Sequence, residues 1–265
     1  MPQSVYNEGQ RPYDTLINGI GIYGSLDASS FGSFDYELMT GALDVNDDQP
    51  VSNLFTGSAK DPNLAINFFG SNMKSEANTT LMVQWNTPLE GLRLRDTYSN
   101  GKVSFNSQYA VNDKMDYKLD YTNVFSAEYT WEEFVFVSEV THSKNTTYGL
   151  SGIFSGMNGS TRPFGWYSGV TYQINDEWQL GSYYSEDYSE RKEKGTYVNM
   201  MTQANGSVGW MKDMALTLRY DINANWLVKL EAHYMNGLKD VDYFDGATKG
   251  GDKWQLYGIK TTVSF

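Results

Sequence analysis

Charged side chains stand two residues apart in several stretches of the sequence. Arg93 and Arg95 are separated by a single leucine, and so are Lys229 and Glu231. A spacing of two places both charges of a pair on one face of an extended strand, with the leucine on the other face. Rows of guanidinium, ammonium and carboxylate groups can attract or repel ions and polar solutes that pass along such a face. The spacing therefore predicts a charged wall that selects solutes.

Eight charged residues are candidates for this wall because each falls on the polar parity of its own alternating stretch. They are Arg93, Arg95, Glu128, Glu139, Arg219, Lys229, Glu231 and Lys260. Asp44, Asp47 and Asp48 lie in the longest polar stretch and are candidates for an inward-folded constriction loop. The alternative is that these three acids only solvate an external loop. Their spacing lacks the glycine and distal glutamate of a calcium loop, so no metal site is predicted.

Enzymatic chemistry has few candidates. The chain has no cysteine and only two histidines, His142 and His233. A general base needs a partner that orients it, and the sequence identifies no partner for either histidine. The absence of cysteine excludes a thiol nucleophile, a thiolate metal site and a disulfide scaffold. We therefore predict no catalytic residue, metal or cofactor, and no enzymatic activity.

The elements that must position these charges are strands. Between residues 226 and 234, apolar residues occupy one parity, while Lys229, Glu231 and His233 occupy the other. The same alternation is found at residues 34–38, 81–85, 92–95, 214–221 and 257–265. A period of two indicates strands with one apolar and one polar face. No run of about 18 apolar residues exists, so the sequence predicts no transmembrane helix.

The composition agrees with a two-faced strand protein. The 265 residues include 20 tyrosines and 7 tryptophans, yet the mean hydropathy is only −0.51. A low average suits a chain whose apolar residues occupy every second position. The aromatic content excludes a disordered chain. The net charge of −12 argues against nucleic acid as a partner, because nucleic-acid binding requires a basic surface.

Short turns alternate with long polar stretches along the chain. The predicted turns are residues 28–32, 87–91, 131–133, 175–177 and 223–225, and the long stretches are roughly 43–78, 99–114, 142–164, 189–210 and 237–251. Gly, Asn, Asp and Pro in the turns supply the dihedral angles of a tight reversal. Sorting of connections into short and long is expected of an outer-membrane barrel, which has short periplasmic turns and long extracellular loops.

Four tryptophans lie at or beside the predicted short turns. They are Trp85, Trp131, Trp178 and Trp226. Amphipathic rings favour the headgroup level of a membrane, so this placement predicts an aromatic girdle around a barrel. The alternative is that each tryptophan closes the end of a soluble barrel core. That alternative does not explain the charged residues in the middle of the strands, which a wet lumen accommodates.

Several segments resemble porin-like proteins of Gram-negative outer membranes. The similar segments are residues 2–11, 18–24, 126–131 and 218–226. Phe265 with Val263 resembles the C-terminal signal that the barrel-assembly machinery reads, although Lys260 stands where that signal usually has glycine. The resemblance implies an all-β, antiparallel transmembrane barrel in the bacterial outer membrane. It also implies contact with outer-membrane lipid and a homotrimer.

The number of strands bears on the domain organisation. Alternation predicts about eleven strands, whereas bacterial outer-membrane barrels have an even number. In the proteins that it resembles, the segment like residues 2–11 lies well inside the chain, and no secretory signal is found here. We therefore hypothesise that residues 1–265 form a single barrel domain that lacks an N-terminal part of a sixteen-stranded barrel. The alternative is a strand hidden in residues 64–69 or 103–111.

Function follows from a wide barrel with a charged interior. Such a barrel encloses an aqueous channel, so we expect a porin for passive diffusion of small hydrophilic solutes. One alternative is a non-conducting scaffold or adhesin that displays extracellular loops. Another is an outer-membrane hydrolase. Conductance in a lipid bilayer separates the porin from the scaffold, and hydrolysis of lipid or peptide would favour the enzyme.

Overall fold

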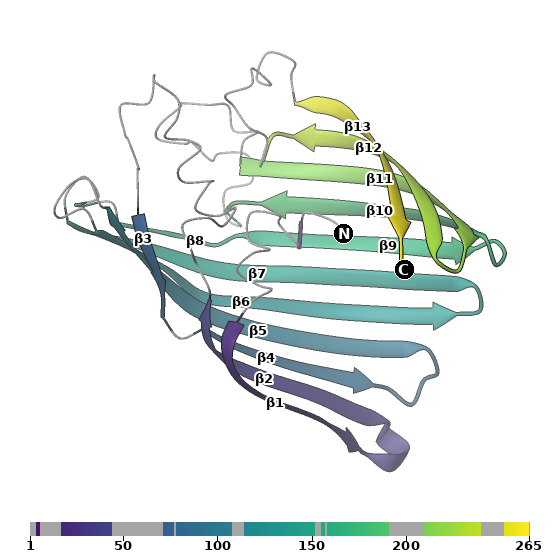
Figure 1. Cartoon of the computed structure of the whole chain (residues 1–265), viewed down its shortest axis with the longest axis horizontal. Coiled ribbons are helices and arrows are strands. Elements are labelled where there is room, and N and C mark those ends of the chain that lie inside the picture. The colour runs from purple at the N-terminus through teal and green to yellow at the C-terminus, as the bar shows by residue number, and fades with distance from the viewer. Residues whose placement is uncertain are drawn as a thin grey trace.

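The chain folds into one antiparallel sheet, as the alternation predicted (Figure 1). The computed structural model describes residues 4–5, 17–43, 71–76, 78–107, 114–151, 155–156, 158–190, 209–239 and 252–264. The helical element among them is one short 3-10 turn, η1 (Ser29–Phe31). No described helix has the length and apolar character that a membrane span requires.

Eleven strands follow one another as neighbours in the sheet, which agrees with the predicted number. They are β1 (Ile17–Asp27), β2 (Ser33–Leu43), β4 (Asn78–Asn86), β5 (Leu92–Ser107), β6 (Lys114–Trp131), β7 (Phe134–Ser151), β9 (Phe164–Gln173), β10 (Trp178–Tyr188), β11 (Trp210–Asn223), β12 (Trp226–Gly237) and β13 (Lys253–Val263). Two short strands lie beside this path. β3 (Ser71–Ser75) pairs with β5, and β8 (Gly159–Thr161) pairs with β7.

All five predicted turns join neighbouring strands at one end of the sheet, which we call the short-turn end (Figure 1). The turn from β6 to β7 consists of only Glu132 and Glu133, and Glu132 has a φ of 50°. Gly91 has a φ of 83°, and a Cβ there would lie 2.0 Å from the Thr130 carbonyl oxygen. Glycine is therefore required at this turn. The opposite end of the sheet is the long-loop end.

Three of the predicted long loops are partly strand, and the first of them, residues 43–78, contains β3. Residues 99–114 and 142–164 were expected to be loops, but β5 continues to Ser107 and β7 continues to Ser151. Residues 99–102 and 142–147 carry no large apolar side chain, so they interrupt the apolar alternation that marks a strand in the sequence. Backbone pairing with neighbouring strands nevertheless extends them. Residues 103–107 thus belong to β5 and do not form a separate strand, and residues 64–69 lie outside the described residues.

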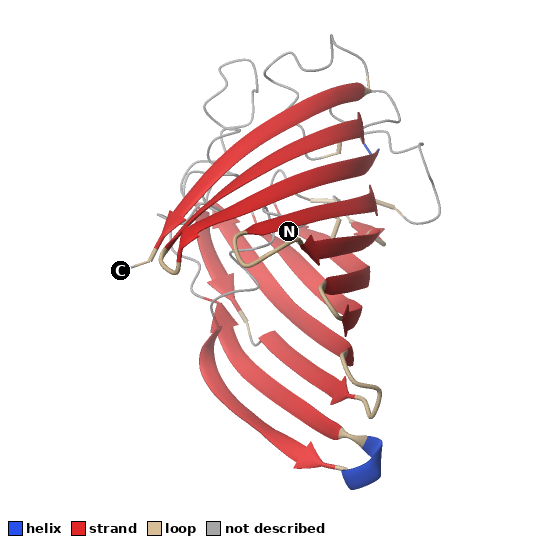
Figure 2. Cartoon of the chain, turned by 90° about the vertical axis from the view of Figure 1, so that its right-hand side faces the viewer, coloured by secondary structure: helices blue, strands red, loops and turns tan. Residues whose placement is uncertain are grey.

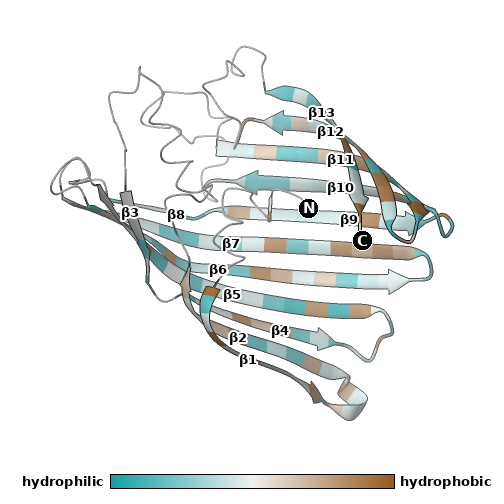
Figure 3. Ribbon diagram, in the orientation of Figure 1, coloured by the Kyte–Doolittle hydropathy of each residue, from teal (hydrophilic) through white to brown (hydrophobic). Residues whose placement is uncertain are grey.

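The strand register sorts the side chains into two faces. Residues that are paired across antiparallel strands point to the same side of a sheet. One continuous row runs through Asp35, Gln84, Arg95, Ser126, Glu139, Tyr167, Ser185 and Asp213. We call the side of this row the polar face. The opposite side, the apolar face, carries residues such as Val83, Leu216 and Leu230, and Figure 3 shows the resulting alternation along the strands.

The apolar face is open to its surroundings. Ile20 is 79% exposed, Leu216 is 56% exposed and Ile259 is 77% exposed. No large side chain among the described residues is fully buried. A sheet in water normally covers one face with a second layer of structure, and exposed apolar patches on soluble monomers rarely exceed a few hundred Å². The described residues provide no such layer over the apolar face.

The sheet is twisted and curved into a trough, with β1 and β13 at its two edges (Figure 2). The polar face lines the concave side, where residues 4–5 also lie (Figure 1). Both edge strands run from the long-loop end to the short-turn end, and within the described ranges they do not pair with each other. That the sheet is part of a sixteen-stranded barrel stays a prediction.

Candidate functional site

The predicted basic pair on β5 lies on the polar face. Arg93 forms an ion pair with Glu128 on the neighbouring strand β6. The Nε and Nη2 atoms of Arg95 donate to Oε1 of Gln84 at 3.0 and 2.6 Å. The Arg93 side chain is 50% exposed. Both guanidinium groups are therefore held in place by neighbouring strands and stay accessible to solvent.

Gln84 connects the basic pair to an acidic group. Its Nε2 lies 3.3 Å from the Asp35 carboxylate, and Asn86 donates to the same carboxylate at 2.8 Å. A chain of hydrogen bonds thus runs across β2, β4 and β5. Such a chain fixes the positions of a positive and a negative group on one wall. We call the polar face of β2, β4, β5 and β6 near the short turns the open wall.

Basic and acidic residues also alternate on the last strands. Arg219 pairs with Asp221 at 2.9 Å, and Lys229 pairs with Glu231 at 2.7 Å, each within one strand. Lys260 stands directly opposite Lys229 in the register, and no described residue forms an ion pair with it. Two lysines side by side repel each other, so this part of the wall keeps a positive field.

The structure does not gather the predicted wall residues into one cluster. Strands β6, β7, β9 and β10 separate the basic pair on β5 from Arg219 on β11. The candidates for the constriction loop, Asp44, Asp47 and Asp48, lie outside the described residues, as does Phe265. Val263 lies on the apolar face opposite Trp226. An inward-folded constriction loop that carries these acids stays a prediction.

Glu139 lies on the predicted face, but it is buried. It is only 8% exposed and accepts a hydrogen bond from Ser126 Oγ at 2.6 Å. Toward the long-loop end, Ser185, Asp187 and Asp213 on the same face are also buried. Charged groups are seldom buried without partners. We call this part of the polar face, on β7 and β9 to β12, the covered wall.

A polar network occupies the covered wall. Asp213 accepts a hydrogen bond from Tyr183 Oη at 2.6 Å and lies 3.0 Å from Nδ1 of His233. On the other side of the ring, Nε2 of His233 lies 4.0 Å from a Glu231 oxygen. Asp187 forms a further ion pair with Lys239. The network therefore ties β10, β11 and β12 together with buried polar groups.

His233 has the partner that the sequence did not identify. Asp213 orients its Nδ1, as in catalytic dyads, but its Nε2 lies 4.0 Å from Glu231, and no hydroxyl of a described serine or threonine is hydrogen-bonded to it. His142 contacts the Tyr121 ring edge-on on the apolar parity. The described residues contain no group of three His, Asp or Glu side chains arranged to hold a metal ion. The geometry favours a structural role for His233.

The four predicted girdle tryptophans lie on the apolar face at the short-turn end. Neighbouring rings accompany them, with centroid distances of 6.0 Å for Phe34–Trp85, 6.1 Å for Trp131–Phe134 and 4.4 Å for Trp178–Tyr220. The indole of Trp85 donates to the Phe31 carbonyl at 2.7 Å, and that of Trp226 donates to Thr261 Oγ1 at 2.7 Å. Trp131 is 52% exposed. The rings form a belt and do not fill a core.

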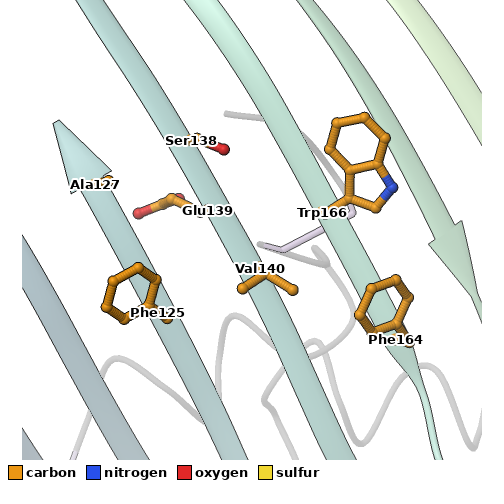
Figure 4. A pocket seen from close by; sticks show the side chains of 7 residues that line it. All are labelled: Phe125, Ala127, Ser138, Glu139, Val140, Phe164 and Trp166. Atoms are coloured by element: carbon orange, nitrogen blue, oxygen red, sulfur yellow. The ribbon is translucent and has the colours of Figure 1, made fainter. Parts of the chain in front are cut away.

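The apolar face also has a shallow hollow of about 350 Å³ (Figure 4). It forms because the small side chains of Ala127 and Ser138 lie between the bulkier Phe125, Val140, Phe164 and Trp166. These residues stand on β6, β7 and β9, with their rings pointing away from the polar face. The hollow therefore lies on the opposite side of the sheet from the charged wall residues.

Sequence reasoning missed several residues of the site. Gln84, Asn86, Tyr183 and Asp213 were not among the predicted wall residues, although each falls on polar parity. The parity of Asp213 follows from Arg219 and was thus available in the sequence. Its burial and its bond to His233 depend on the register between β11 and β12, which the sequence pattern does not show.

Among known proteins, the chain has matches in solved structures only. No family model and no curated protein matches the sequence. One matching solved structure is a Pseudomonas aeruginosa FadL homologue, with 13% sequence identity and a TM-score of 0.45, and the match covers 92% of this chain and 67% of that one. Another is the CymD monoaromatic hydrocarbon channel, with 9% identity and a TM-score of 0.43, covering 93% of this chain and 72% of that one. A third is the NanC porin, with 12% identity and a TM-score of 0.39, covering 92% of this chain and 99% of that one. Similarities at this level identify neither a family nor a solute.

Proposed function

We propose that the protein is a channel of the bacterial outer membrane, through which small hydrophilic solutes diffuse passively. The observation that carries this proposal is the contrast between the two faces of one sheet. Large side chains of the apolar face, such as Ile20, Leu216 and Ile259, are exposed, while charged groups line the concave face. In water, exposed apolar surface costs about 25 cal/mol per Å². Lipid around the convex side removes that cost.

The dimensions of the strands support a membrane location. A transmembrane strand needs about 9–11 residues, and the strands of the main path have 9 to 18 residues. The aromatic belt at the short-turn end fits the headgroup level of one membrane surface. The longer strands β5, β6 and β7 would then project beyond the membrane at the long-loop end. In an outer membrane, short turns face the periplasm.

The charges of the open wall support the proposal that the solutes are hydrophilic. Arg93, Arg95 and Asp35 line the concave side with fixed charges, and their side chains remain accessible. An apolar solute would have to displace the water around these groups, whereas an ion or a polar solute exchanges hydration for contacts with them. Among ions, the charge of Arg95, which forms no ion pair with a described residue, favours anions near this wall.

Planar-bilayer recording of the double variant Arg93→Ala/Arg95→Ala tests the proposal. In water, an ion about 8 Å from a unit charge gains roughly 0.5 kcal/mol, so each arginine changes the local anion concentration roughly two-fold. We expect the reversal potential in a salt gradient to shift toward cation selectivity. Lys253→Ala is the matched control, because it removes a positive charge from the apolar parity of β13. Unchanged selectivity in the double variant would contradict the assignment of the open wall to the channel.

The same recording distinguishes the alternatives. A scaffold or adhesin that only displays loops would give no conductance steps at any voltage. For a hydrolase, the Asp213–His233 pair is the relevant observation, but Tyr183 and Glu231 occupy the positions around it. We therefore propose that the protein is not an enzyme. A homotrimer and recognition by the barrel-assembly machinery remain predictions.

A further inference from the structure

A short described segment outside the sheet lies on the concave side. It consists of Ser4 and Val5, drawn in purple beside β9 in Figure 1. Ser4 is only 5% exposed, and its Oγ has no hydrogen-bond partner among the described atoms. A serine on an open, water-filled face would be solvated. Its burial indicates that the segment is pressed against other parts of the chain.

The contact of this segment with the sheet is at Gly165 on β9. A Cβ at Gly165 would lie 1.8 Å from the Ser4 carbonyl oxygen and 2.8 Å from the Ser4 carbonyl carbon. No side chain fits at such distances. The φ of Gly165 is not in the left-handed region, so its backbone conformation does not require glycine. The close approach of another backbone explains the glycine instead.

The surroundings of Gly165 belong to the covered wall. In the register, Gly165 stands between Thr141 on β7 and Asp187 on β10, and both lie on the polar face. Asp187 is buried, and so is Glu139, which lies two residues from Thr141 on β7. On the open wall, by contrast, Arg93 is half exposed. The position of Ser4 thus coincides with the part of the polar face that is withdrawn from solvent.

We propose that Ser4–Val5 is a lumenal segment seated on Gly165, and that it narrows the channel on the side of β7, β9 and β10. The proposal rests on the proposed channel function, because only a conducting lumen can be narrowed. A backbone segment that lies on the concave face reduces the cross-sectional area of the channel and directs solutes along the open wall. Ser4 and Gly165 then act as positioning residues that set the size limit for solutes.

The contact of Ser4 with Gly165 can be tested by thiol labelling, because the chain has no cysteine. Ser4→Cys introduces one thiol and breaks no described hydrogen bond of the Ser4 side chain. A charged methanethiosulfonate reagent should modify it slowly in the reconstituted protein. Adding Gly165→Ala places a methyl group where the Ser4 carbonyl lies, so we expect labelling at least about tenfold faster, a change of about 1.4 kcal/mol in the barrier.

Gly258→Ala is the matched control. Gly258 also lies on the polar face, but a Cβ there would meet only Glu231 atoms at 3.8 Å. The control should label at the rate of Ser4→Cys alone. Equal labelling rates in Ser4→Cys with and without Gly165→Ala would show that Ser4 is not seated there, and would overturn the proposal.

Single-channel conductance tests the narrowing itself. In the Cys-free background, Gly165→Ala should raise the conductance and admit larger sugars in a liposome-swelling assay, while Gly258→Ala should change neither. Faster labelling without a rise in conductance would refute the narrowing. If Gly165→Ala fails to assemble, deletion of residues 4 and 5 should produce the same rise, and its absence would refute the narrowing too. A wild-type protein without any conductance would refute the channel function, whereas the labelling rates would still report whether Ser4 contacts Gly165.

Discussion

The open wall and the covered wall are built by the same alternation on the same face of one sheet, yet their side chains differ in environment. On the open wall, the Arg93 and Glu128 side chains are 50% and 35% exposed. On the covered wall, those of His233 and Asp213 are 12% and 10% exposed. Exposed charges are weakly coupled to their neighbours, whereas buried ones depend on them. We therefore expect solute selection from the open wall and stability from the covered wall.

Removing Asp213 should have the largest effect on stability. Asp213→Ala leaves Tyr183 and His233 without their shared acceptor in a buried site, which should lower the free energy of unfolding by about 3 kcal/mol. Urea unfolding in detergent or lipid, followed by tryptophan fluorescence, measures the change. Asp35→Ala on the open wall is the control, and its free energy of unfolding should fall much less. Equal losses at the two sites would erase the distinction between the walls.

Gln84 should have an intermediate effect. Gln84→Ala removes the group that joins Arg95 to Asp35, so we expect a loss of about 1 kcal/mol, typical of a partly exposed hydrogen bond. The guanidinium of Arg95 would become mobile, which should increase the amplitude of the noise in the open-channel current. Gln179→Ala, which removes a hydrogen bond to Gln173 instead, is the control and should leave the noise unchanged. Unchanged noise in Gln84→Ala would mean that Gln84 does not position Arg95.

Neutralising Glu128 should have the smallest effect on stability. The ion pair with Arg93 is exposed, so Glu128→Gln should cost less than about 1 kcal/mol, and the loss should shrink further in high salt. The uncompensated Arg93 should nevertheless shift selectivity toward anions, opposite in sign to the arginine variants. A large loss of stability, or a shift toward cations, would place this pair in a different environment from the one described.

Much of the architecture was predictable because it depends on local chemistry. The alternation of apolar and polar residues predicted which side chains share a face, and turn residues such as Gly91 predicted where strands reverse. The tryptophans beside the turns predicted the belt. Residues 99–107 and 142–151 were missed as strands because residues 99–102 and 142–147 carry no large apolar side chain and interrupt the period of two.

The sequence by itself therefore determined the two faces of the sheet, the sorting of turns to one end and the charge of the wall. These follow from the geometry of a single strand, whose side chains alternate with a period of two. Only the tertiary structure decided which charges are buried and which partners they have. Asp213 meets His233 through the register of two strands, and Ser4 meets Gly165 across 161 positions of chain. Contacts between distant residues depend on how the strands pair and what lies against them, and no local pattern encodes that.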